Sequence, residues 1–138
     1  MRLTIATAGS RGDVQPYVAL GLGLQAAGHE VIMAADASFE AFVRGHGLAF
    51  APLHLDPREP LGADIRRIGR NPAAMLRWLR QHYTPDRQYF ADLLAACEDA
   101  EAVLVAALAF PAIHVAEALR IPWLAALIQP WTPNRAAS

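Results

Sequence analysis

Residues 3–35 read LTIATAGSRGDVQPYVALGLGLQAAGHEVIMAA, and their pattern decides the fold. The opening run, LTIAT, is short, apolar and rich in β-branched side chains, which is typical of a buried strand. From Pro16 onward, apolar side chains recur at steps of three and four residues, which predicts a helix that ends at Gly28. A second strand follows at residues 30–35. This stretch is therefore a strand–helix–strand unit.

The rest of the chain repeats this alternation. The sequence predicts further strands at residues 48–53, 102–107 and 122–127, and helices that begin at Ser38, after Thr84-Pro85, and near residue 111. Such an alternation predicts an α/β fold with a Rossmann-like, doubly wound parallel sheet. Five strands in such a sheet most often run in the order 3-2-1-4-5, with the first strand central. Residues 54–71 interrupt the pattern with prolines and clustered charges, and long excursions of this kind are often functional.

The composition limits the class of protein. At 138 residues, the chain has the length of one compact domain. Its formal net charge of -1 argues against a nucleic-acid partner, because such proteins carry a strongly basic surface. The single cysteine, Cys97, falls in an apolar helical stripe with Phe90, Leu93 and Leu94, and it favours a reducing, cytoplasmic setting. We see no signal peptide and no apolar run of about 18 residues, so we expect no membrane span.

Topology alone places a binding site. In a sheet of this order, ligands bind where the strand order reverses, beyond the carboxyl ends of strands 1 and 4. Residues 9–15 and 107–111 meet there, and residues 129–133 lie nearby. Asp13 therefore faces the crevice, and His114 lies near it. Two roles for Asp13 stay open on these grounds: it could cap the following helix or complement its dipole, or it could serve as the base of an enzyme.

The loop that precedes this helix matches no standard phosphate-binding motif. Gly9 and Gly12 lack the third glycine of a dinucleotide fingerprint, and no Gly-Lys-Ser/Thr follows as in a P-loop. Its backbone N–H groups can still hold an anion at the helix start, with Arg11 either assisting or extending into solvent. His54 and Asp56 have no third ligand close in sequence, so we expect neither a metal nor another cofactor.

Three stretches resemble one family. They are GSRGDVQP with the later GHEV (residues 9–16 and 28–31), FEAFVRGHGLAFAPL (39–53) and HVAEALRIPWLAALIQPWTP (114–133). Together they resemble the start of nucleotide-sugar glycosyltransferases of the GT-B fold. The closest group contains sterol glucosyltransferases and the enzymes that glycosylate antibiotic aglycones. The resemblance covers nearly the whole chain and weakens over residues 55–95, a region that varies with the acceptor in this family.

The resemblance implies a domain organisation. Residues 1–133 correspond to the N-terminal, acceptor-binding domain, incomplete at its C-terminal end, and residues 134–138 form a tail. The C-terminal domain, which binds most of the nucleotide-sugar donor, is absent from the chain. We therefore expect the isolated chain to be inactive. Its expected partners are a lipophilic small-molecule acceptor such as a sterol or polyketide, and a second copy that associates through the exposed apolar crevice face.

The resemblance also gives site residues their roles. Related plant enzymes carry Gly-His-x-x-Pro at this point, with the histidine as general base, and here the frame reads Gly12-Asp13-Val14-Gln15-Pro16. Asp13 thus stands in the position of the base, and concerted proton removal from an acceptor hydroxyl does not need a strong one. The donor diphosphate would lie near Gly9, Ser10, Arg11 and Gly12. The candidate acceptor contacts are Met75, Trp78, Phe110, His114 and Trp131, whose alternative role is ordinary packing.

Two other functions compete with glycosyl transfer. A binding module would keep the acceptor pocket or an assembly surface and catalyse nothing. A nucleotide-sugar epimerase of the same fold would act on the donor sugar and would need no lipophilic acceptor. Dependence on an acceptor separates these alternatives from a transferase.

Overall fold

The computed structural model describes residues 1–54, 73 and 87–128, and these form one parallel sheet covered by helices. The strands are β1 (Arg2–Ala6), β2 (Glu30–Asp36), β3 (Ala49–Leu53), β4 (Ala102–Val105) and β5 (Trp123–Ala125). All neighbours pair in parallel, in the order β3-β2-β1-β4-β5. The predicted α/β fold, with its first strand at the centre of a doubly wound sheet, is confirmed.

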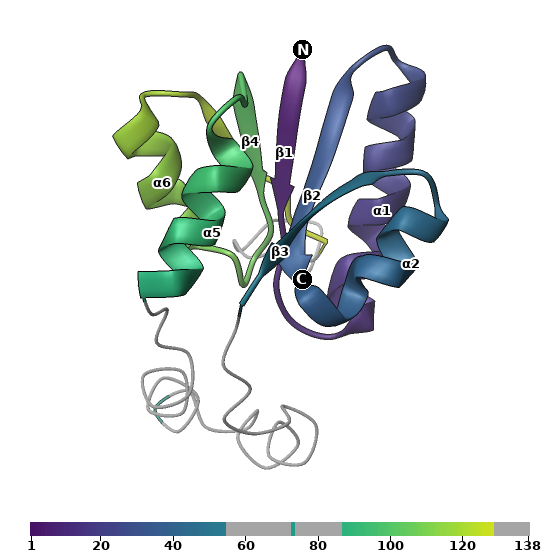
Figure 1. Ribbon diagram of the computed structural model, residues 1–138, viewed down its shortest axis with the longest axis horizontal. Helices are drawn as coiled ribbons and strands as arrows, with labels where there is room; N and C mark the ends of the chain where they lie inside the picture. The colour runs from purple at the N-terminus through teal and green to yellow at the C-terminus, as the bar shows by residue number, and fades with distance from the viewer. Residues whose placement is uncertain (55–72, 74–86, 129–138) are drawn as a thin grey trace, which may run out of the picture.

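Helices lie on both sides of the sheet (Figure 1). The helices are α1 (Arg11–Ala26), α2 (Glu40–Gly45), α5 (Arg87–Cys97) and α6 (Pro111–Leu119), and a short 3-10 turn, η1 (Ala37–Phe39), precedes α2. The pair α1 and α2 covers one face, and the pair α5 and α6 covers the other (Figure 1). Because the strands are all parallel, their carboxyl ends lie at the same edge of the sheet. The loops that lead into the helices begin at this edge.

Two glycines shape the packing and the end of α1. A Cβ atom at Gly21 would lie 3.0 Å from Leu48 Cδ1, so the glycine lets the helix approach closely without displacing Leu48. Gly28 has φ +88 and ends the helical segment as predicted, because a side chain is strained in this left-handed region. The N–H of His29 then donates to the carbonyl of Leu24 at 3.1 Å and closes the helix end.

The start of α1 differs from the prediction. The helix begins at Arg11 with Ser10 as its N-cap, so Pro16 lies inside the helix rather than in its first turn. A proline here removes the N–H that would bond to the carbonyl of Gly12. Gly12 is exposed, so water can hydrate that carbonyl and the loss is small. The first turn therefore contains Asp13.

The cap of the next helical segment also differs from the prediction. The N-cap is Asp36 rather than Ser38, and its carboxylate accepts hydrogen bonds from the backbone N–H of Ser38 at 2.9 Å and from the Ser38 hydroxyl. An aspartate at a strand end reaches forward by two residues in this way.

The core stripe of α5 is shifted from the predicted one. Leu93 and Cys97 are buried as expected, but Tyr89 and Ala96 complete the buried face, while Phe90 and Leu94 are exposed. Phe90 and Leu94 make one flank of this stripe apolar as well, so periodicity alone does not decide the face. Burial raises the pKa of the Cys97 thiol to about 11, so Cys97 acts as a packing residue.

Candidate functional site

A cavity lies at the carboxyl edge of the sheet, where the strand order reverses between β1 and β4. Its volume is about 190 Å³. The lining residues are Ala8, Asp13, Tyr17, Ala106, Ala107, Leu108 and Ile128. They come from the end of β1, the first turns of α1 and the segments that follow β4 and β5. Two of them, Asp13 and Tyr17, bring polar groups to a site that is otherwise apolar.

Asp13 is the third residue of α1, and hydrogen bonds fix one of its two carboxylate oxygens. Oδ2 accepts from the backbone N–H of Ser10 at 2.7 Å and from the Ser10 hydroxyl at 2.8 Å. The Asp13 carbonyl accepts from the Thr7 hydroxyl at 3.1 Å. The side chain thus completes the cap of α1, as a carboxylate at this position often does. Within the described residues these bonds fall on Oδ2 alone, so Oδ1 is the oxygen available to a ligand.

Gly9 makes room for this carboxylate. Its φ of +115 lies in the region that favours glycine. A Cβ atom on Gly9 would lie 2.5 Å from Asp13 Oδ2 and 3.1 Å from Leu108 Cδ1. The glycine therefore allows the Asp13 side chain to fold back over the loop and brings that loop against the segment after β4.

Tyr17 lies one helical turn after Asp13 and lines the same cavity. Its hydroxyl donates a hydrogen bond to the carbonyl of Ala126, which ties α1 to the end of β5. Burial raises the pKa of Tyr17, and the negative charge of Asp13 raises it further, so the phenol stays neutral. The sequence pattern indicated only a packing role for Tyr17. Its four-residue spacing from Asp13 was the available signal that both face one site.

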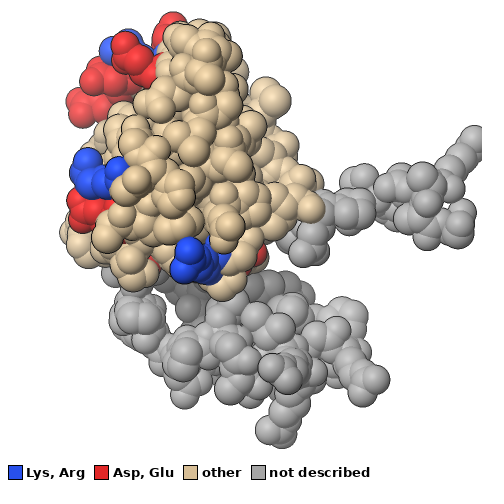
Figure 2. All heavy atoms as spheres, turned by 90° about the vertical axis from the view of Figure 1, so that its right-hand side faces the viewer, with Lys and Arg blue, Asp and Glu red and all other residues tan. Residues whose placement is uncertain are grey.

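Ser10 and Arg11, two residues of the predicted donor-phosphate loop, have different surroundings. The N–H of Ser10, expected to face a diphosphate, is already bonded to Asp13. The Arg11 guanidinium lies 4.7 Å from the centre of the Phe42 ring, in a cation–π contact. Arg11 thereby lines a second groove, between α1 and α2, together with Phe42 and His46. Figure 2 shows that the face formed by these helices is mostly uncharged. The structure does not bring Arg11 to the Asp13 cavity.

The candidate acceptor contacts fall into two groups. Met75, Trp78 and Trp131 lie outside the described residues. Phe110 is the half-exposed N-cap of α6, and His114 is exposed, with Nδ1 3.9 Å from Glu117 Oε2. Neither side chain lines the cavity. Their roles in acceptor binding therefore stay predictions.

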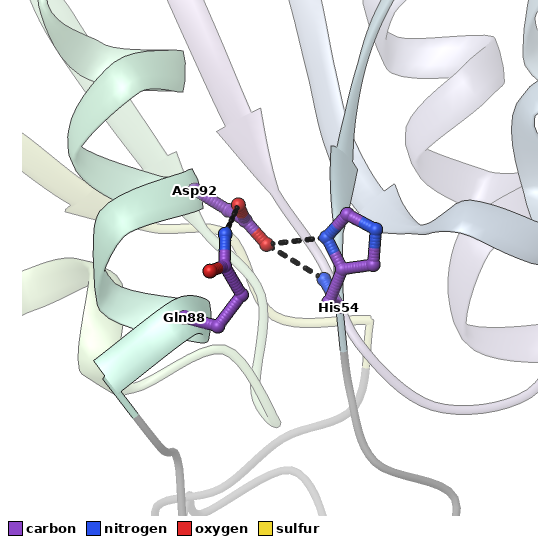
Figure 3. Close-up of polar contacts among 3 residues, drawn as sticks. All are labelled: His54, Gln88 and Asp92. Carbon is purple, nitrogen blue, oxygen red and sulfur yellow. Dashed lines mark hydrogen bonds and ion pairs between the residues drawn. The ribbon is translucent and has the colours of Figure 1, made fainter.

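A polar cluster that the sequence did not indicate joins the end of β3 to α5 (Figure 3). Asp92 Oδ2 accepts from the backbone N–H of His54 at 2.9 Å and from its ring Nδ1 at 2.8 Å. Asp92 Oδ1 accepts from the Gln88 side-chain amide at 2.8 Å. Burial acts to raise the pKa of Asp92, but the hydrogen bonds from His54 and Gln88 outweigh it, and the net pKa is lowered. Sequence reasoning paired His54 with Asp56 and missed Asp92, 38 residues away, because no local pattern links them.

Two kinds of feature are missing from the described part of the chain. Within residues 1–54 and 87–128, no three His, Cys, Asp or Glu side chains gather as a metal site would require. In the same ranges, no helix combines the length and the apolar character needed to cross a bilayer.

The fold and the cavity at its switch point define a Rossmann-like α/β domain, and comparison with known proteins identifies the family. Residues 3–138 match the model of the glycosyltransferase family 28 N-terminal domain. The chain therefore belongs to this family, and the resemblance seen in the sequence is confirmed.

Relatives with similar sequences carry a more specific name. The chain is 43% identical to a sterol 3-beta-glucosyltransferase of Aspergillus oryzae over 99% of its own length, and 42% identical to that of Aspergillus fumigatus over the same share. It spans only 10% of the length of each relative. The similarity thus covers the whole of this chain but a small part of those proteins.

Solved structures match the fold. The Streptomyces glycosyltransferase SsfS6, crystallised with thymidine diphosphate, superposes with a TM-score of 0.66 at 28% identity, over 96% of this chain and 40% of that one. The glycosyltransferase VinC, in complex with dTDP, gives a TM-score of 0.70 at 23% identity, over 92% of this chain and 34% of that one. The likeness to VinC concerns the fold alone. The match to one half of a GT-B glycosyltransferase confirms the predicted fold class.

Proposed function

We propose that the chain is the acceptor-side portion of an inverting glycosyltransferase. The enzyme would move a sugar from a nucleotide-sugar donor to a hydroxyl of a lipophilic acceptor, with Asp13 as general base. The observation that carries this proposal is the asymmetry of the Asp13 carboxylate. Oδ2 is fixed by Ser10, Oδ1 has no partner among the described residues, and Asp13 lines a cavity at the switch point of the sheet.

The chemistry follows from this arrangement. The acceptor hydroxyl donates a hydrogen bond to Asp13 Oδ1, and its oxygen attacks the anomeric carbon of the donor. The new carbon–oxygen bond forms as the bond to the nucleoside diphosphate breaks, the hydroxyl proton passes to Oδ1, and the diphosphate leaves with the electron pair. Attack on the face opposite the leaving group inverts the anomeric centre. Because Ser10 holds Oδ2, the base needs little reorganisation in the transition state.

A sterol is the acceptor class that we favour. Several relatives more than 40% identical over 99% of this chain are named sterol 3-beta-glucosyltransferase. Apolar cavity-lining residues such as Leu108 and Ile128 suit a steroid ring system. A nucleoside diphosphate bound in the related SsfS6 supports a nucleotide-sugar donor. The donor would be held mainly by a second domain, no metal or other cofactor is required, and the reaction would take place in the cytoplasm.

A non-catalytic binding module is the second candidate, and one observation favours it. Asp13 caps α1 through Oδ2, which gives this residue a structural role that needs no chemistry. A module of this kind would bind the same lipophilic ligand in the same cavity and release it unchanged.

Dependence on an acceptor tests the proposal. The chain would be joined to the donor domain of a related sterol 3-beta-glucosyltransferase and incubated with a nucleotide sugar, with and without a sterol. We expect a sterol glycoside of inverted anomeric configuration, identified by NMR, only when the sterol is present. Sterol binding without any product would favour the binding module. Conversion of the donor sugar without a sterol would favour an epimerase.

Self-association belongs to the same proposal. Trp123, Leu124, Leu127 and Ile128 are exposed on β5 and the segment after it. An exposed apolar edge strand tends to pair with a second copy. We expect light scattering to show an average mass that rises with concentration, and Leu124→Glu to lower it. Leu20→Glu, a similar change on α1, should not, and a concentration-independent monomer would contradict the prediction.

A further inference from the structure

His54 lies at the same edge of the sheet as Asp13. It directly follows β3, and Asp13 follows β1 through a short loop. The strands are parallel, so their carboxyl ends share one edge. Only β2 separates β3 from β1, which places the two strand ends two strand spacings, or about 10 Å, apart. A ligand as long as a steroid can therefore extend from one to the other.

Asp92 sets the chemical state of the His54 ring. An ionised carboxylate only accepts hydrogen bonds, so the nitrogen that faces it, Nδ1, carries the proton. In the neutral imidazole, Nε2 is then an acceptor. Figure 3 shows Nδ1 directed at Asp92, with the other ring nitrogen on the far side of the ring. The His54 side chain is 62% exposed, and no described residue bonds to Nε2.

This arrangement differs from that of two other described histidines, His46 and His114. His46 Nδ1 contacts the Phe42 carbonyl of its own helix, and His114 Nδ1 lies 3.9 Å from an exposed glutamate one turn away. The partner of His54 is a carboxylate from a distant helix with a side chain only 12% exposed. The bond from the His54 backbone N–H already ties β3 to α5. The additional ring bond fixes the direction of the imidazole, which a purely structural link does not need.

We propose that His54 is a second polar recognition point of the acceptor site. Its Nε2 accepts a hydrogen bond from a second hydroxyl of the acceptor, at the end away from the hydroxyl that faces Asp13. Asp92 is a positioning residue that fixes the tautomer and direction of the ring. This inference rests on the proposed function and narrows it, because the favoured substrates are lipophilic alcohols with a hydroxyl at each end. An acceptor with a carbonyl at the far end has no proton to donate to Nε2, so it forms no hydrogen bond there.

Three steroid probes test this recognition. They share one ring system with a hydroxyl at one end, and carry a hydroxyl, a ketone or no polar group at the other. Dissociation constants would be measured by calorimetry on the 138-residue chain at about pH 8, where an imidazole is ordinarily neutral. We expect the diol to bind about three- to tenfold more tightly than the ketone and the mono-alcohol, as one neutral hydrogen bond allows. The imidazole ¹⁵N resonances of His54 should shift with the diol only.

Matched variants separate recognition from structure. In His54→Asn, the side-chain amide can still donate to Asp92 from the position of Nδ1, and only Nε2 is lost. It should abolish the preference for the diol without changing the melting temperature. Asp92→Ala should reduce the preference, because the ring loses the acceptor that directs it. His29→Asn, at the opposite edge of the sheet, should keep it in full.

The outcomes distinguish this inference from the proposed function. Equal binding of all three steroids, or a preference for the diol that survives in His54→Asn, would overturn the role of His54 and leave sterol binding intact. Failure of all three steroids to bind would overturn both the role of His54 and the sterol acceptor.

Discussion

Two carboxylates at the same edge of the sheet are used in opposite ways. Asp13, at the start of α1, has bonds to Oδ2 alone among the described residues, whereas Asp92, on α5 beside the end of β3, has bonds to both oxygens. A carboxylate with a spare oxygen can accept a proton from a substrate. One with both oxygens engaged can only orient its neighbour. From this difference we assign proton transfer to Asp13, at the start of α1, and the orientation of His54 to Asp92, on α5.

The largest expected effect comes from Asp13→Asn in the chain joined to a donor domain. Asparagine keeps the shape of the side chain and can still accept bonds from Ser10, but it cannot take a proton. Turnover should fall about 10²–10⁴-fold, the usual weight of a general base, while the melting temperature changes little. Turnover and thermal unfolding would be measured on the same preparation.

Asp13→Ala is the matched control for the cap. It should lower the free energy of unfolding by about 1 kcal/mol as well as abolish turnover. Near-normal turnover in Asp13→Asn would restrict Asp13 to its capping role and remove the contrast with Asp92.

Gly9→Ala should have the next largest effect. The new Cβ atom would meet Asp13 Oδ2 at 2.5 Å in a backbone region that L-residues rarely adopt. We expect a loss of roughly 1–3 kcal/mol in the free energy of unfolding, measured by urea denaturation, and reduced turnover from a displaced carboxylate. Gly23→Ala is the control, since a Cβ there meets nothing within 4 Å and should stabilise α1. Equal stability of the two variants would show that the loop does not restrain Asp13.

Tyr17→Phe should have a smaller effect on stability and little on turnover. The change leaves the Ala126 carbonyl without its phenol donor, which costs about 1 kcal/mol in the free energy of unfolding. Urea denaturation and steady-state turnover would measure the two quantities. A fall in turnover as large as that of Asp13→Asn would show that Tyr17 takes part in the reaction and that Asp13 does not act alone.

The smallest expected effect is that of Asp92→Asn on how the free energy of unfolding changes with pH in acid. The pKa of Asp92 is lower in the folded protein than in the unfolded chain. Its ionised form therefore stabilises the fold at pH values above the unfolded pKa, which is near 4. This stabilisation is lost as the pH falls through the folded pKa. Asp92→Asn should therefore be less stable than wild type at neutral pH. The gap should narrow in acid, as followed by urea denaturation at several pH values. A gap independent of pH would mean that the charge of Asp92 does not stabilise the fold.

The same comparison explains what the sequence could predict. The partners of Asp13 lie within a few residues, so the position of the crevice and the two roles of this side chain followed from strand order and local motif. His54, which bonds to Asp92, lies 38 residues away from it, and Ala126, which bonds to Tyr17, lies 109 residues away, so only the folded chain brings these pairs together. The start of α1 was mispredicted because Pro16 is a common first-turn residue. The face of α5 was mispredicted because Phe90 and Leu94 form an apolar row beside the buried one.

Asp13 caps α1 and is also the proposed general base, and this combination affects how activity is inferred from related sequences. A descendant of this domain that had lost its reaction would still need a carboxylate or an equivalent at this point to finish the first turn of α1. Selection for folding alone would therefore keep Asp13, or a similar capping residue, in a pseudoenzyme. Among such proteins, the better diagnostic is the space around Oδ1, since filling that cavity with larger side chains would abolish transfer and leave the cap untouched.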